Sequence, residues 1–467
     1  MEAGREVLDG ARKKDSSFSV QSSLVESVGI LLLALLTAAG IRYRIGPLTA
    51  LAGVALCLAG NYRPRALLVL ALALTLFSGD LAGAGELQES LIAFNISDIL
   101  LLCALPGLIW QARQPPMELW GRPALIYLAA GLGSFLWNLP VMGEERLSYL
   151  SGFLRTLQIV LMLPLACSVV SWPPEAIRKL LGGYLAGAVL LATWGLAAFA
   201  GGMRDGLYLL GNHKNAMGLA LAMAALIAVA ALTQPETGDM ESEAQSSPVF
   251  PFRGARPILM AVAALCLLGL ICTLSRSGYL ALLAGAVFLA VARRRGRILG
   301  ILLCAMVVAL IGVHLMLPQK AASYVGDFSP ERDNIQERII ANRRSLARFR
   351  QNWLLGDGFR ARRDLHPHNL EVLLLAENGI VGTALFAWLL AAQTRLFLKG
   401  RARFRQDPLR ECFCIAILAC SLATLTHAQF DPYWRRGPLW LPWAGMGIVA
   451  SMLRAARSED QEGFLPS

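Results

Sequence analysis

Charged residues are scarce in this chain: of its 467 residues only 16% are Asp, Glu, Lys or Arg, whereas 56% are hydrophobic. Soluble globular proteins carry about 25% charged residues, so the composition excludes an ordinary soluble enzyme. Apolar runs of roughly 17–25 residues recur along the chain, and each is long enough to cross a bilayer as a helix. The sequence therefore predicts an all-α fold, a polytopic membrane helix bundle.

We predict about fourteen membrane spans, or twelve if the short ones at 46–60 and 98–112 are re-entrant. The other spans are predicted at 25–41, 66–83, 122–142, 150–170, 180–201, 215–233, 257–274, 277–292, 298–317, 370–398, 411–428 and 438–453. The predicted divisions are a cytoplasmic tail (1–24), a transmembrane bundle (25–317), a large helical periplasmic loop (318–369), C-terminal transmembrane helices (370–455) and a second cytoplasmic tail (456–467).

The net charge of +11 reflects orientation in the membrane and does not indicate nucleic acid binding. With the N-terminus inside, Lys and Arg concentrate in the predicted cytoplasmic segments, as the positive-inside rule requires. Segment 318–368 is the exception, because it is both basic and predicted to lie outside. Within it, Glu331–Trp353 has a helical apolar face, which Arg338, Arg343 and Arg350 flank and from which Arg344 and Arg348 point away.

The cysteines and histidines do not form a complete metal site. Nearly all nine cysteines fall inside predicted spans, where they pack as small apolar residues and not as disulfides or ligands. Asp364-x-His366-x-His368 and Glu331-x-Asp333 leave a metal open as an alternative, but no full ligand set is visible. We therefore predict no metal and no cofactor.

Polar residues that are far apart in the sequence are predicted to meet on the outer side of the bundle. They are Gly211–Asn215 before one span, Ser275–Ser277 between two spans, the basic loop with His368, and Phe430–Arg436 before the last span. This convergence at one interface is the main functional argument from the sequence. The alternative is a purely structural role, in which the arginines snorkel or anchor the helices and His368 is a solvated loop residue.

These residue types suit a transfer from a phosphate-linked donor. Without a metal, guanidinium groups are the natural stabilisers of the negative charge on a departing phosphate group. A histidine with a pKa near neutrality can take the proton of a hydroxyl group. The candidate catalytic residues are His368, Arg276 and Arg338, with Asp431 and Glu371 as candidate orienters, and the candidate substrate-binding residues are Arg343, Arg344, Lys214, Asn215, Arg155, Arg435 and Arg436.

Four short patches within about residues 205–385 resemble the O-antigen ligase and polymerase superfamily, which includes the lipopolysaccharide O-antigen ligases. The most specific is His368-Asn369, nine residues, then Gly379-x-x-Gly382. Arg338 followed by Gly356-Asp-Gly358 resembles the family's Arg and Gly-x-Gly before the histidine. Ser275-Arg276 and the segment Gly211–Asn215 resemble two further family patches. The chain departs from the pattern at Asn342, where the family usually has an aromatic residue, and His366 has no counterpart.

The resemblance implies a metal-independent, inverting glycosyltransferase in the bacterial inner membrane, with its active site on the periplasmic side. It would transfer a preassembled glycan from undecaprenyl diphosphate to a hydroxyl group of lipid A-core. By this resemblance His368 is the base, and Arg276 and Arg338 bind the diphosphate. A polysaccharide polymerase and a protein O-oligosaccharyltransferase stay open as alternatives, and a lipid-linked glycan transporter is the alternative from another class.

Overall fold

The computed structural model describes residues 29–34, 36–37, 46–77, 96–111, 120–140, 146–202, 214–234, 255–296, 300, 307, 311, 333–359, 367–431 and 440–462. Throughout these residues the regular structure is helical, without a strand. Six of the described helices are long and apolar enough to cross a membrane. The prediction of an all-α, multi-pass membrane protein is confirmed.

The helices follow the predicted spans closely. All but two of those spans coincide with described helices, and the remaining two, 25–41 and 298–317, lie largely outside the described residues. The total of twelve to fourteen spans therefore stays a prediction. The helices are α2 (Gly46–Tyr62), α3 (Pro64–Leu74), α4 (Ile96–Gln111), α5 (Gly121–Asn138), α6 (Arg146–Leu157), the π-helical turn η3 (Gln158–Met162), α7 (Leu163–Val169), α8 (Pro174–Ala200), α9 (Lys214–Leu232), α10 (Ala255–Cys272), α11 (Arg276–Ala292), α14 (Asp333–Gln351), α15 (Leu370–Arg403), α16 (Pro408–Ala428) and α17 (Trp440–Glu462).

Helix α9 is buried on nearly all sides by α8, α10, α11 and α16. After its first two residues, its sequence is almost entirely Ala, Leu, Met and other apolar residues, as expected of a helix enclosed by protein. Small residues allow its neighbours to approach closely, since a Cβ added at Gly218 would lie 2.8 Å from the Cβ of Ser275. Such packing holds membrane helices together where lipid tails offer no hydrophobic driving force.

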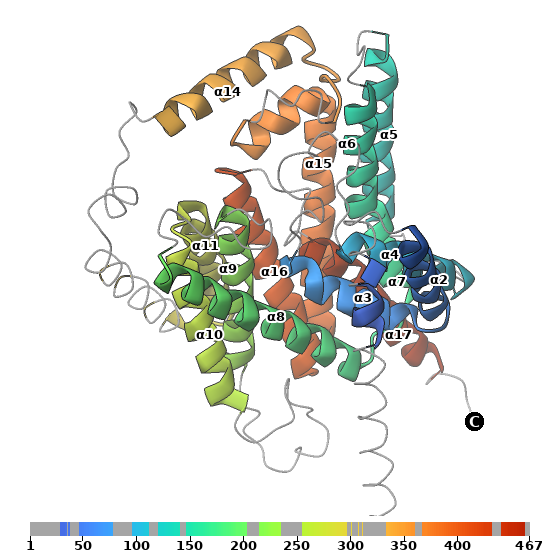
Figure 1. Cartoon of the computed structure of the whole chain (residues 1–467), viewed down its shortest axis with the longest axis vertical. Coiled ribbons are helices and arrows are strands. Elements are labelled where there is room, and N and C mark those ends of the chain that lie inside the picture. Colours follow the sequence, from blue (N-terminus) through green and yellow to red (C-terminus); the bar gives the residue numbers. More distant parts are fainter. Residues whose placement is uncertain are drawn as a thin grey trace, which may run out of the picture.

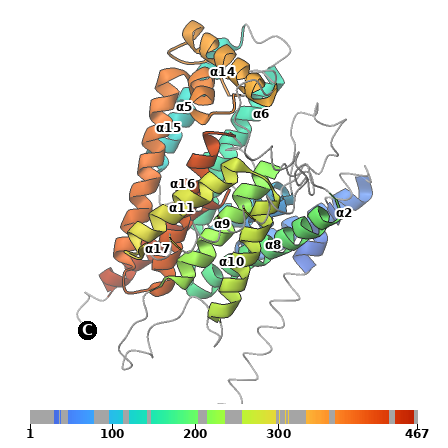
Figure 2. The same cartoon turned by 90° about the vertical axis from the view of Figure 1, so that its left-hand side faces the viewer.

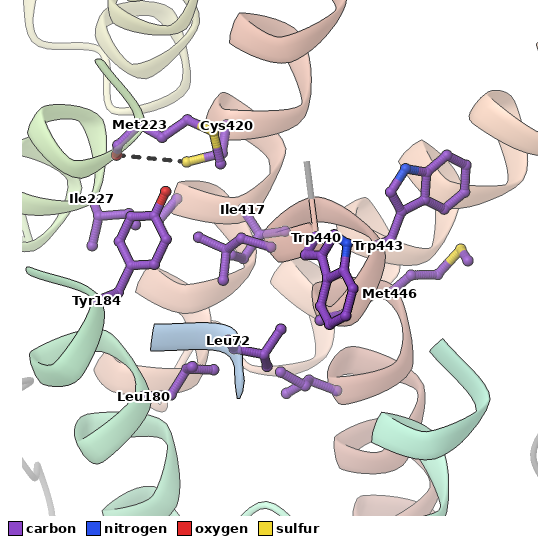
Figure 3. Close-up of a cluster of buried hydrophobic side chains, with 14 of the residues drawn as sticks. Leu72, Leu180, Tyr184, Met223, Ile227, Ile417, Cys420, Trp440, Trp443 and Met446 are labelled. Atoms are coloured by element: carbon purple, nitrogen blue, oxygen red, sulfur yellow. Dashed lines mark hydrogen bonds between the residues drawn. The ribbon is translucent and has the colours of Figure 1, made fainter. Parts of the chain in front are cut away.

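A buried apolar cluster joins α3, α8, α9, α16 and α17 (Figure 3). Leu72, Tyr184, Ile417 and Trp440 are fully buried within it. The Cys420 thiol donates a hydrogen bond of 3.7 Å to the carbonyl of Met223, which ties α16 to α9. This core fixes the axis of α16, whose last turn reaches the polar cluster described below.

Helix α15 is broken at Gly379, which corrects the single continuous span expected over 370–398. Gly379 has φ 62° and ψ −168°, a backbone conformation that residues with a Cβ rarely adopt. The apolar run does not reveal the break, because hydropathy is insensitive to backbone angles. The first part of α15 is therefore a separate short helix that begins beside His368.

The segment Trp353–Phe359, which we call the crosspiece, lies across this break. It supplies hydrogen-bond partners to the ends of both parts of α15, which would otherwise have unsatisfied backbone groups. The amides of Asp357 and Gly358 donate to the carbonyls of Ala376 (2.9 Å) and Glu377 (2.6 Å), and the carbonyls of Trp353 and Leu354 accept from the amides of Ile380 (2.9 Å) and Val381 (3.3 Å).

Helix α14 lies across one end of the bundle, above the short first part of α15 and level with the tips of α5 and α6 (Figures 1 and 2). We call this the α14 end. The opposite end carries a different polar cluster, in which Glu411 pairs with Arg293 at 2.8 Å and with Arg401 at 3.6 Å. The sequence predicts that the α14 end is periplasmic and that the basic opposite end is cytoplasmic.

Candidate active site

Three helices begin at the α14 end, and each begins with polar residues. Asn215 lies in the first turn of α9, Ser275 caps α11, and Asn369 caps α15. The Ser275 hydroxyl accepts the amide of Gly278 at 3.2 Å, and Oδ1 of Asn369 accepts the amide of Val372 at 3.0 Å. Helix N-termini carry partial positive charge, so this end of the bundle is suited to anions.

The turn His427–Asp431, which we call the α16 turn, joins these helix starts to α14. Arg338 of α14 donates from Nη1 to the carbonyl of Phe430 at 3.2 Å. Asn369 donates from Nδ2 to the Gln429 side-chain oxygen at 3.2 Å. The segments that carry Arg338 and His368 thus contact consecutive residues of one short turn. The described parts of two of the predicted outer segments therefore meet at this turn; residues 211–213, 360–366 and 432–436 lie outside the described residues.

Asn215 links α9 and α11 to the same turn. Its Nδ2 donates to the Asp431 carboxylate at 2.5 Å, and its Oδ1 accepts from the Ser275 hydroxyl at 3.0 Å. The His427 ring nitrogen Nε2 lies 3.0 Å from the Asn215 carbonyl. Arg276, which follows Ser275, is half-buried at the first position of α11. This network therefore fixes the helix start that carries Arg276.

Asp431 is a buried carboxyl group within the network, 6% exposed. Burial raises its pKa to about 6, whereas the Asn215 hydrogen bond and the Arg338 charge act in the opposite direction. The carboxyl group therefore has a pKa of about 6, and its charge interacts with the guanidinium of Arg338. From the sequence, Asp431 was only a candidate for orienting a catalytic side chain. The pattern that marks it is His427-x-x-x-Asp431 at the end of an apolar run.

His368 lies one residue before the cap of α15 and is half-buried. Its neighbour Asn369 is held from two sides, by the amide of Val372 and by the side chain of Gln429. This arrangement leaves little freedom to the backbone that carries the imidazole. His368 therefore lies at the start of α15, beside the α16 turn.

The arginines of α14 point only partly as the sequence predicted. Arg338 faces inward as expected, but Arg348 also faces inward, and its Nη1 lies 3.4 Å from Oδ2 of Asp357. Arg343, Arg344 and Arg350 are exposed. The prediction for Arg348 was wrong because the helix is polar on average, so its apolar residues do not form a single buried face; Leu346 within it and Trp353 just beyond it are exposed.

The other predicted substrate-binding residues have diverse surroundings. Lys214 is buried at the first position of α9. Arg155 donates from Nη1 to Asp98 at 2.5 Å and to Gln158 at 2.8 Å, so its charge is balanced by a carboxylate that is fully buried. The sequence did not predict this partner, which lies on another helix. Arg435, Arg436, His213 and His366 lie outside the described residues.

No group of three or more His, Cys, Asp and Glu side chains in the described part of the chain is arranged to hold a metal ion. Asp364, His366 and Glu331, which belong to the two alternative metal motifs, lie outside that part. Among the described residues, Arg276 and Arg338 carry guanidinium groups at the helix starts and the α16 turn, and Lys214 lies next to Asn215 at the start of α9. An arrangement of this kind can bind an anionic group by charge and hydrogen bonds.

Residues 261–387 match a family model described as O-Antigen ligase. The matched stretch runs from α10 to the second part of α15 and includes Arg276, Arg338, the crosspiece and His368. It supports the superfamily that the sequence motifs indicated. No curated protein matches the chain. Asn215 and Asp431 lie outside the matched stretch and are joined to it only through the fold.

Proposed function

Because residues 261–387 carry an O-antigen ligase domain within a multi-pass membrane protein, we propose that this chain is a metal-independent glycosyltransferase of the O-antigen ligase type. It transfers a preassembled glycan from undecaprenyl diphosphate to a hydroxyl group of lipid A-core, at the periplasmic face of the inner membrane. The observation that carries the proposal is the meeting of the segments with Arg276, Arg338 and His368 at the α16 turn.

The donor diphosphate binds between the starts of α9, α11 and α15. Arg276 and Arg338 offer planar guanidinium groups to the phosphate oxygens, and the nearby helix N-termini add partial positive charge. Lys214 and Asn215 flank the same region at the start of α9. The undecaprenyl chain extends into the surrounding lipid, while the glycan projects from the α14 end.

His368 acts as the general base. Its imidazole accepts the proton of the acceptor hydroxyl, and the oxygen attacks the anomeric carbon of the glycan. The bond between that carbon and the diphosphate oxygen breaks, and undecaprenyl diphosphate leaves with the bonding electrons. Arg276 and Arg338 stabilise the charge that develops on the leaving oxygen. A single displacement inverts the configuration at the anomeric carbon, and the proton passes from His368 to solvent.

The test is transfer by the purified protein from a defined undecaprenyl-diphosphate glycan to lipid A-core in the presence of a chelator. The wild-type protein is expected to form a product of inverted configuration, and His368→Ala is expected to form none. A product of retained configuration, or transfer that the chelator abolishes, would contradict the mechanism. Replacing lipid A-core by a second lipid-linked glycan tests the polymerase alternative, which would be favoured if only that acceptor reacts.

A further inference from the structure

Arg348 and Asp357 form an ion pair that the proposed mechanism does not use. The pair joins the last turn of α14 to the crosspiece, with 3.4 Å between Nη1 and Oδ2. Both side chains are largely buried, 21% and 15% exposed. Asn352 donates to the other oxygen of the carboxylate, Oδ1, at 2.5 Å. The carboxylate of Asp357 is thus held by Arg348 in the last turn of α14 and by Asn352, the first residue after it.

The crosspiece is anchored on its other side to α5. The Gly356 carbonyl accepts from Nδ2 of Asn138 at 3.1 Å and from the Ser134 hydroxyl at 3.4 Å. The Phe359 ring packs edge-on against Tyr127, with 5.7 Å between ring centroids. Together with the bonds to both parts of α15, these contacts make the crosspiece a fixed reference within the bundle. The Arg348–Asp357 pair is a side-chain link between α14 and that reference, in addition to the chain itself, which continues from α14 through Asn352.

We propose that Arg348 and Asp357 are positioning residues that set the angle of α14 and thereby the distance between Arg338 and His368. Arg338 lies ten residues before Arg348, which is about 15 Å along an α-helix. A change of about 10° in the helix angle at Arg348 would therefore move Arg338 by roughly 3 Å. Misplacement of about 1 Å already lowers rates about a hundredfold in some enzymes, so a tilt of this size matters. This inference rests on the proposed function.

The competing explanation is that Arg348 itself binds the donor diphosphate. The contacts favour positioning, because Arg348 already faces a carboxylate, whereas Arg338 reaches the α16 turn beside the helix starts. The two explanations differ in the partner of Arg348, which is Asp357 for positioning and the donor diphosphate for binding. Positioning requires that Arg348 and Asp357 act as a unit, and phosphate binding does not involve Asp357.

The activity test is a double-mutant cycle. We expect Arg348→Ala and Asp357→Ala each to lower kcat/KM for the donor by about tenfold to a hundredfold, because each displaces Arg338 from the donor diphosphate and from His368. The double variant is expected to be no worse than either single variant, and the exchange R348D/D357R is expected to regain activity. Arg350→Ala removes the same charge from an exposed position on α14 and serves as the control, with unchanged kcat/KM. Independent effects of the two substitutions, or a raised donor KM in Arg348→Ala with Asp357→Ala unaffected, would overturn the proposal.

A second measurement is independent of glycosyl transfer. Spin-label amino acids incorporated at Ile340 of α14, eight residues before Arg348, and at Leu398 of α15, both exposed, report the distance between the two helices by pulsed electron paramagnetic resonance. The distribution is expected to broaden or shift in Arg348→Ala and in Asp357→Ala, and to stay unchanged in Arg350→Ala. If the distribution of spin-label distances is unchanged in both variants, the positioning role is refuted even if the transfer activity is confirmed. If the spin-label distance shifts in the variants but the wild-type protein transfers no glycan, the proposed function is rejected, whereas the role of Arg348 and Asp357 in setting the angle of α14 stands.

Discussion

Gly356 and Gly379 face each other's chain segments across the break in α15, and neither position leaves room for a Cβ. A Cβ added at Gly356 would lie 2.5 Å from the amide nitrogen of Asn378, and one added at Gly379 would overlap the Leu354 carbonyl. Both glycines have positive φ, 69° and 62°. Two glycines from separate sequence motifs thus serve one joint, at which the crosspiece replaces the missing turn of a helix.

Gly379→Ala is expected to destabilise the protein by at least about 2 kcal/mol, because the alanine is strained at positive φ and its Cβ meets the crosspiece. Unfolding by denaturing detergent in mixed micelles measures this change. Gly182→Ala in α8 is the matched control, because a Cβ there meets nothing within 4 Å, and alanine favours the helix. Equal stability of the two variants would show that the joint is not rigid.

Asp431→Asn tests the buried carboxyl group of the α16 turn. Its pKa in the folded protein, about 6, lies above the ordinary value of 3.8, so folding favours the protonated form. The contribution of Asp431 to stability is therefore fully present below pH 3.8 and is lost as the pH rises through about 6. The asparagine variant should therefore be the more stable protein at pH 8, by about 1–3 kcal/mol, with the difference fading toward pH 4. Thermal unfolding at both pH values provides the comparison, and a pH-independent difference would refute the assignment.

Ser275→Ala removes the cap of α11 and the hydrogen bond to Asn215. The loss is expected to cost about 1 kcal/mol of stability and to loosen the start of the helix that carries Arg276. Hydrogen exchange at the first turn of α11 should rise in this variant. Thr193→Ala is the control, because that exposed hydroxyl bonds only within its own helix. Unchanged exchange in Ser275→Ala would mean that the cap does not hold Arg276.

Arg338→Ala is expected to raise the donor KM by about tenfold to a hundredfold, since it removes a charge-assisted hydrogen bond to the diphosphate. Arg343→Ala and Arg344→Ala test the prediction that those residues bind substrate as well. Their exposed orientation points to smaller effects, below about threefold. Steady-state kinetics with varied donor concentration distinguish these cases. A larger effect at Arg344 than at Arg338 would reverse the assignment.

Much of this architecture could be predicted from the sequence because hydropathy determines where helices cross a membrane. Counting spans from the N-terminus already places Asn215, Ser275 and His368 at the same end. The break at Gly379 could not be predicted in this way, because glycine is tolerated in membrane helices and the hydropathy of a segment does not determine its backbone φ angles. The inward turn of Arg348 and the pairing of Arg155 with Asp98 depend on side chains from distant segments, which periodicity along one helix cannot reveal.

The division of roles between His368 and Arg276 is tested most directly by measuring undecaprenyl diphosphate binding and glycan transfer on the same preparations. His368→Ala is predicted to bind the lipid diphosphate as tightly as the wild-type protein while forming no product. Arg276→Ala is predicted to lose affinity for the same ligand. If His368→Ala binds as weakly as Arg276→Ala, or if Arg276→Ala binds normally, a separate base and a separate diphosphate-binding arginine are excluded.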